Sequence, residues 1–119
     1  MDLTAITARL KQEEAEAAAR RERALEAARE TPDEDVPDVG DLGQRTEFKD
    51  RQLADAEAAD GHLEEVRAAL ARIEAGTFGL CVVDGEPIEE ERLRAVPWAS
   101  HCLRHQAERE TSATRPPSL

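Results

Sequence analysis

Two long runs without strong helix breakers, separated by a single break, constrain this chain more than any other feature. Residues 3–30 contain no Gly or Pro, and residues 44–75 contain only Gly61. Both runs are dominated by Ala, Glu, Arg and Leu, which are strong helix formers. Between them, residues 31–43 (TPDEDVPDVGDLG) contain two prolines and two glycines. Two runs of similar length around one short break predict an antiparallel helical hairpin.

An apolar stripe runs along each predicted helix. Its residues recur mostly at spacings of three, four and seven, which suits close packing against one partner helix. We therefore predict a coiled-coil contact between the two runs, with arms roughly 40 Å long at about 1.5 Å per residue. The predicted contact residues are Leu3, Ile6, Leu10, Ala17, Ala24, Leu25 and Ala28 in the first run, and Phe48, Leu53, Ala56, Leu63, Val66, Leu70 and Ile73 in the second.

The character of the sequence changes at Gly76, which is a natural stop for the second helix. Residues 76–110, called the knuckle below, contain a short β-type segment, an Asp-Gly turn and a short helical stretch. The few apolar residues there form too small a core to stand alone. We expect a mainly α fold: a helical hairpin at 1–75 with an acidic tip at 31–43, the knuckle with a short C-terminal helix, and a disordered tail at 111–119.

Charge and composition exclude several classes of function. The formal net charge of −11 argues against direct binding to a nucleic-acid backbone, which requires clustered Lys and Arg. No apolar run approaches the length of a membrane span, and the first residues lack the apolar core of a signal peptide. Two cysteines without an export signal indicate a reducing compartment. We therefore expect a soluble, cytoplasmic protein without membrane contact. We also expect a monomer, although nothing in the sequence determines the oligomeric state.

The knuckle carries a specific pattern. Gly-Thr-Phe-Gly precedes Cys81, Gly-Glu-Pro-Ile follows it, and Pro-Trp precedes Cys102. With the spacing between the two cysteines, these motifs resemble the C-terminal zinc-finger region of the DksA/TraR family of bacterial transcription factors. The resemblance extends over most of the chain and implies the same fold, a helical hairpin followed by a zinc finger.

The resemblance also implies a role for the hairpin tip. In the family, the hairpin enters the secondary channel of RNA polymerase and brings its acidic tip near the catalytic magnesium. The tip motif of the family, Asp-x-x-Asp-x-Ala, falls here on residues 38–43, with Asp38 and Asp41 present and Gly43 in place of the alanine. An ordinary solvated turn is the alternative reading of such an acidic loop. The glycine weakens helix propensity by about 1 kcal/mol, which leaves the strength and sign of the transcriptional effect open.

A further implication concerns zinc. Four-cysteine members of the family hold the ion at the positions occupied here by Cys81, Asp84, Cys102 and His105. Imidazole is a common zinc ligand and carboxylate a less common one, so both replacements keep a side chain that can bind the metal. His101 is a neighbouring substitute or a bystander. A metal-free knuckle, held by apolar packing around two buried thiols, is the alternative.

Three further hypotheses follow from the same residues. Some members of the family bind the alarmone ppGpp through basic residues, but Glu65, Val96 and Gln106 stand at those positions here, so we predict no such site. A zinc- or redox-responsive interaction protein using Cys81 and Cys102 is the alternative function. A small hydrolase using a histidine is disfavoured, because the chain has no nucleophile motif and little length for a pocket. We interpret the chain as a non-enzymatic regulator that binds RNA polymerase.

Overall fold

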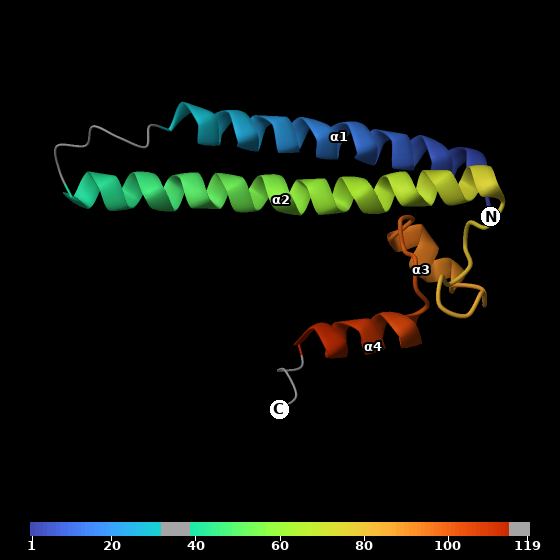
Figure 1. Cartoon of the computed structure of the whole chain (residues 1–119). Coiled ribbons are helices and arrows are strands. Elements are labelled where there is room, and N and C mark those ends of the chain that lie inside the picture. The colour runs from blue at the N-terminus through green and yellow to red at the C-terminus, as the bar shows by residue number, and fades with distance from the viewer. Residues whose placement is uncertain (32–38, 115–119) are drawn as a thin grey trace. The chain divides into compact units, whose positions relative to one another are not determined.

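The computed structural model describes residues 1–31 and 39–114, and the side chains of 39–45 and 112–114 lie outside that description. The described chain contains, in order, α1 (Leu3–Glu30), α2 (Val39–Ala75), α3 (Glu90–Ala95) and α4 (Leu103–Thr114) (Figure 1). An isolated antiparallel bridge joins Leu80 to Pro87 in the turn between α2 and α3. The predicted fold class, two long helices followed by a knuckle and a short C-terminal helix, is confirmed.

The chain divides into two compact units, Lys11–Glu64 and Met1–Leu10 with Glu65–Leu119. Within Lys11–Glu64, the segments of α1 and α2 lie side by side in opposite directions (Figure 1). Two polar pairs connect them: Glu13 Oε2 lies 3.0 Å from His62 Nε2, and Asp60 Oδ1 lies 3.3 Å from Arg21 Nε. Small side chains allow the helices to approach closely. The buried residues of this contact are Ala17, Ala24, Ala28, Ala56, Ala59 and Leu63.

The prediction of the helix contact is wrong for three residues. Leu3, Phe48 and Leu53 are exposed, to 44%, 39% and 45% respectively. At about 100° per residue, Leu53 lies about 60° around the helix from Ala56, whereas Gln52 lies about 40° away on the other side. Gln52 is half-buried. The side of α2 that packs against α1 therefore includes Gln52, and the apolar Leu53 faces solvent.

Two helix ends also differ from prediction. Helix α2 begins at Val39 rather than at residue 44, because glycine costs only about 1 kcal/mol inside a helix and does not by itself break one. Asp41 and Gly43 thus belong to the first turns of α2, while Asp38 lies outside the described residues. Helix α4 continues to Thr114, so residues 111–114, expected in the disordered tail, are helical.

The remaining helix ends have local causes. The Asp2 side chain accepts hydrogen bonds from the N–H groups of Thr4 and Ala5, at 3.0 and 3.2 Å, and caps α1. At the end of α2, Thr77 N–H donates to the Arg72 carbonyl at 2.9 Å, and Gly76 has a φ of 77°. This left-handed ending is typical of glycine and confirms the predicted stop. None of these helices, within the described part of the chain, has the length and apolar character needed to cross a lipid bilayer.

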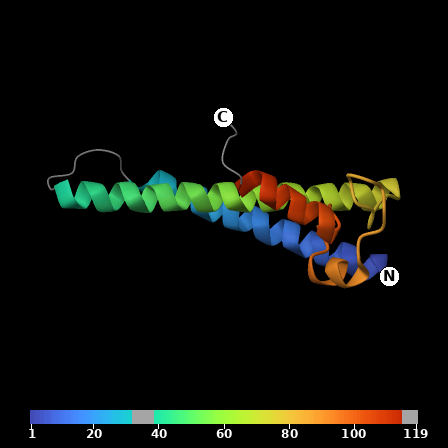
Figure 2. The same ribbon diagram turned by 90° about the horizontal axis from the view of Figure 1, so that it is seen from below.

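The unit of Met1–Leu10 and Glu65–Leu119 has two apolar clusters. In the first, Leu10, Val66 and Ala69 are buried beneath Ile6, Leu70, Ile73, Phe78 and Trp98. The second cluster comprises Cys81, Ile88, Leu93 and Ala99, with Phe78, Val96 and Cys102 packed against it. Phe78 belongs to both clusters and so joins the knuckle to the helices of this unit. Figure 2 shows the start of α1 beside α3, where Arg9 donates to the carbonyls of Arg94 and Ala95 at 2.6 and 3.3 Å.

Candidate metal centre

Cys81 is positioned by a tight turn in the knuckle. Its N–H donates to the Glu86 carbonyl at 2.8 Å, and its own carbonyl accepts from Gly85 N–H at 2.8 Å. Gly79 and Gly85 have φ values of 86° and 73°, which residues with a Cβ rarely adopt. The turn places Cys81 in the apolar cluster, where only 2% of the residue is exposed.

Cys102 and His105 come from the start of α4. Cys102 directly precedes the first helical residue, and its carbonyl accepts from Gln106 N–H at 2.8 Å. A spacing of three residues in a helix places two side chains on the same face. Val82 N–H also donates to the Ser100 carbonyl at 2.9 Å, which connects the Cys81 turn to the segment that leads into α4.

The side chains from these two segments converge on one ring nitrogen. His105 Nδ1 lies 3.4 Å from Cys81 Sγ and 3.2 Å from Cys102 Sγ. These three ligand atoms are buried and lie within 4.8 Å of one another. Asp84 Oδ2 lies 3.6 Å from the same nitrogen. Bonds of about 2.0–2.3 Å in a tetrahedral zinc site place neighbouring ligand atoms about 3.5 Å apart, so the distances from His105 to the two thiols fit zinc.

His101 takes a different position. Among the described residues, the group of potential ligands contains Cys81, Cys102 and His105, and neither His101 nor Asp84. The Nδ1 atom of His101 instead lies 2.7 Å from Ser100 Oγ. Burial lowers the pKa of His101, and the positive charge of Arg109 adds to that effect. Of the two neighbouring histidines, the fold therefore brings His105 to the thiols.

The backbone of the knuckle stabilises negative charge at Cys81. Burial raises the pKa of this thiol, but N–H groups of Cys102, Val83 and Asp84 and the side chain of His105 hydrogen-bond the sulfur and lower the pKa to about 7. Asp84 also has a lowered pKa, first because Glu86 N–H donates to its carboxylate and further because His105 lies nearby. Both groups thus favour the deprotonated form that binds metals.

Two arginines that the sequence analysis did not single out hold the segment before Cys102. Arg72 donates to the carbonyls of Trp98 and Ala99 at 3.5 and 3.4 Å, and burial lowers its pKa. Arg92 Nε donates to the His101 carbonyl at 3.1 Å. Nothing in their spacing distinguishes these arginines from the others in the chain, because their partners are backbone carbonyls, 26 and 27 residues away for Arg72 and 9 residues away for Arg92.

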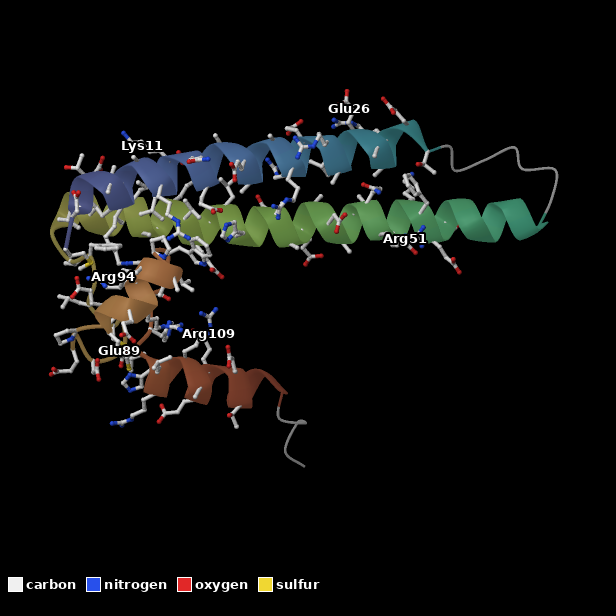
Figure 3. The ribbon with its side chains drawn as sticks, turned by 180° about the vertical axis from the view of Figure 1, so that it is seen from behind. Lys11, Glu26, Arg51, Glu89, Arg94 and Arg109 are labelled. Carbon is white, nitrogen blue, oxygen red and sulfur yellow. The ribbon has the colours of Figure 1, made fainter. Side chains whose placement is uncertain are left out.

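The three positions considered for ppGpp share one cavity. Its volume is about 350 Å³, and its lining mixes both signs of charge. Arg109, labelled in Figure 3, projects from α4 toward α3. The lining residues are Glu65, Arg92, Val96, Trp98, Ala99, Ser100, Gln106, Arg109 and Glu110. Two glutamates accompany the two arginines, so the cavity has no excess of positive charge for an anionic nucleotide.

Comparison with known proteins identifies the knuckle. Residues 76–110 match the prokaryotic dksA/traR C4-type zinc finger family. The structure is similar to that of transcription factor DksA2 from Pseudomonas aeruginosa, with a TM-score of 0.74, 29% sequence identity, and coverage of 92% of this chain and 84% of that chain. The chain has two cysteines, where the C4 description of the family calls for four.

Curated relatives match over shorter stretches. An uncharacterized protein of Aquifex aeolicus is 38% identical over 84 residues, which span 69% of this chain and 56% of that protein. General stress protein 16O of Bacillus subtilis is 46% identical over 46 residues, or 39% of this chain and 28% of the relative. The chain thus spans about half or less of the length of these relatives.

Proposed function

Since this chain belongs to the DksA/TraR family, we propose that it is a non-enzymatic transcription regulator that binds RNA polymerase through the secondary channel. The likeness to DksA2 over nearly the whole chain is the observation that carries this proposal. Asp38 and Asp41 would act near the active site of the polymerase, where a bound cation can receive their negative charge. The knuckle would support the helices rather than perform chemistry.

The helix pair of Lys11–Glu64 suits a role as a narrow probe. Alanines form most of its buried contact, so the two backbones lie close together. The half-buried pair of Glu13 and His62 adds a polar connection between the helices. A narrow and stiff support keeps carboxylates at a defined position inside a channel, which a flexible loop of the same charge would not do.

A binding assay with core RNA polymerase tests the proposal directly. We expect wild type and Asp38→Asn/Asp41→Asn to bind the polymerase similarly, and only wild type to change transcript yield. Asp50→Asn/Asp55→Asn is the matched control, because it removes the same charge from exposed positions further along α2. A wild-type protein that does not bind the polymerase would contradict the proposal.

A cleavage experiment locates the tip in the complex. Fe²⁺ in place of the catalytic Mg²⁺ generates hydroxyl radicals that cut nearby peptide bonds. We expect cuts within residues 31–45 and none within the knuckle. Cuts confined to the knuckle would show that a different end of the chain approaches the active site.

Within this function, we propose that the knuckle binds zinc through Cys81, Asp84, Cys102 and His105. A zinc ion supplies a structural cross-link in such a site. Here the cross-link would join the Cys81 turn to the start of α4, two segments otherwise connected by few hydrogen bonds. This small apolar cluster has the size that usually requires such a staple.

A redox response is the second candidate function, and the proximity of Cys81 and Cys102 favours it. Peroxide would oxidise the two thiols to a disulfide, with two electrons and two protons passing to the peroxide to give water. Cys81→Ser/Cys102→Ser distinguishes the candidates. A polymerase effect that changes with peroxide in wild type and not in this variant supports the redox function. If the effect of the wild-type protein on the polymerase does not change with peroxide, the redox function is excluded.

A further inference from the structure

The proposed zinc ligands differ in their exposure to solvent. Cys81 is 2% exposed and His105 is 9% exposed, and the ligand atoms of both are buried together with that of Cys102. The side chain of Asp84, in contrast, is 36% exposed. Water and dissolved ligands therefore reach the centre most readily at Asp84.

The two oxygens of Asp84 have different surroundings. Oδ1 accepts a hydrogen bond from Glu86 N–H at 3.0 Å, while Oδ2 lies 3.6 Å from His105 Nδ1. The carboxylate can thus offer Oδ2 to a metal while Oδ1 keeps the side chain oriented. Zinc in structural sites favours thiolate and imidazole, and a carboxylate oxygen is a harder donor than these. With zinc bound, Asp84 would therefore form the weakest and the most accessible of the four bonds, and it lies outside the close group of the other three ligand atoms.

We propose that Asp84 is the exchangeable ligand of the zinc centre, while Cys81, Cys102 and His105 hold the ion. Exchange is a ligand substitution: the bond from Asp84 Oδ2 breaks as a bond from water or an incoming chelator forms. Asp84 remains ionised, and no electron is transferred. This inference rests on the proposed zinc site and extends it. With an exchangeable ligand, zinc occupancy would respond faster to changes in the concentration of free zinc than it would in a site of four thiolates.

Substitutions at Asp84 test the inference in the full chain. Asp84→Asn removes the carboxylate but keeps an oxygen that can accept from Glu86 N–H. Asp84→Cys supplies a third thiolate. Glu86→Gln is the matched control, because it removes one negative charge from an exposed side chain of the same turn. Two measurements apply: zinc release into an excess of chromophoric chelator, and the sulfur-to-metal charge-transfer absorption of the Co²⁺-loaded protein.

We expect Asp84→Asn to bind Co²⁺ with the thiolate absorption retained and to release zinc about tenfold faster than wild type. Asp84→Cys should release zinc about tenfold more slowly and absorb more strongly. Glu86→Gln should behave like wild type in both measurements. Together, these results would identify Asp84 as the exchangeable ligand.

Three results would overturn the inference. The first is a wild-type release rate in both Asp84 variants. The second is an Asp84→Asn protein that is folded by circular dichroism and binds no Co²⁺, because Asp84 would then be a holding ligand. The third is a wild-type protein that binds neither metal, which would also remove the proposed zinc site. Polymerase binding is measured separately, so none of these results decides the proposed regulatory function.

Discussion

Cys81 Sγ lies 3.4 Å from His105 Nδ1, although 24 residues separate the two side chains along the chain. Cys102 Sγ lies 3.2 Å from the same nitrogen, so one imidazole contacts both thiols. Any ion that binds these atoms connects the turn after α2 to the start of α4. The local stability of the knuckle should therefore depend on the metal.

Removal of zinc should loosen the knuckle and leave the long helices in place. We expect a chelator, or Cys102→Ser, to lower the stability of residues 79–102 by on the order of several kcal/mol. The pair of helices in Lys11–Glu64 has its own buried contacts and should keep its helix content. Hydrogen exchange followed by mass spectrometry measures both regions at once. Equal exchange of residues 79–102 with and without chelator would contradict this prediction.

Zinc affinity should fall as the pH falls. The pKa of Cys81 is lowered to about 7, so below that pH protons compete with the metal for the thiolate. The pKa of Asp84 is lowered from an already acidic value, so this carboxylate does not contribute to the pH dependence of zinc affinity near neutrality. We expect affinity to decrease by up to about tenfold per pH unit below pH 7 for each proton displaced. Competition with a chelator of known affinity gives the profile, and a flat profile between about pH 8 and about pH 6 would contradict it.

Two leucines of α2 should respond differently to truncation. Leu63 is 1% exposed and Leu53 is 45% exposed. Leu63→Ala should lower the free energy of unfolding by about 2–5 kcal/mol, because it leaves a cavity in the helix contact. Leu53→Ala should change it by about 0.5 kcal/mol or less. Urea denaturation measures both, and equal losses would show that Leu53 is also part of a buried contact.

Gly43→Ala should stabilise the start of α2. The helix begins at Val39, so Gly43 occupies a helical position, where alanine is favoured over glycine by about 1 kcal/mol. We expect a gain of about 0.5–1 kcal/mol in the free energy of unfolding, with Gly61→Ala as a control at an exposed helical glycine in the same unit that has open space around it. A loss of stability at residue 43 alone would show that its glycine is required for the backbone conformation there.

The polymerase complex should not bind ppGpp at a site that includes this chain. Glu65 and Glu110 line the cavity beside Arg92 and Arg109, and their charges oppose those of the nucleotide phosphates. We expect labelled ppGpp to bind polymerase equally with and without the chain. Additional binding that is lost in Arg92→Ala/Arg109→Ala would contradict the prediction.

The ends of the helices show how far local sequence determines this fold. The stop at Gly76 was predictable, because a left-handed glycine ends a helix through hydrogen bonds to residues only a few positions away. The start at Val39 was not, because the two nearby glycines weaken a helix without breaking it. The exposed Leu53 was missed for a related reason. Spacing alone leaves open which of two adjacent residues faces a partner helix.

Local sequence signals are enough to predict two long helices and a cysteine-containing knuckle, since helix propensity, glycine turns and residue spacing act over short distances along the chain. The folded arrangement was needed to show that His105 contacts the thiols while His101 contacts Ser100, and that Asp84 stays near the solvent. The contact of Cys81 with His105 joins two residues that are 24 positions apart in the sequence. Apolar packing and backbone hydrogen bonds set the orientation of each segment. Local residue spacing alone therefore does not show which of the two histidines contacts the thiols.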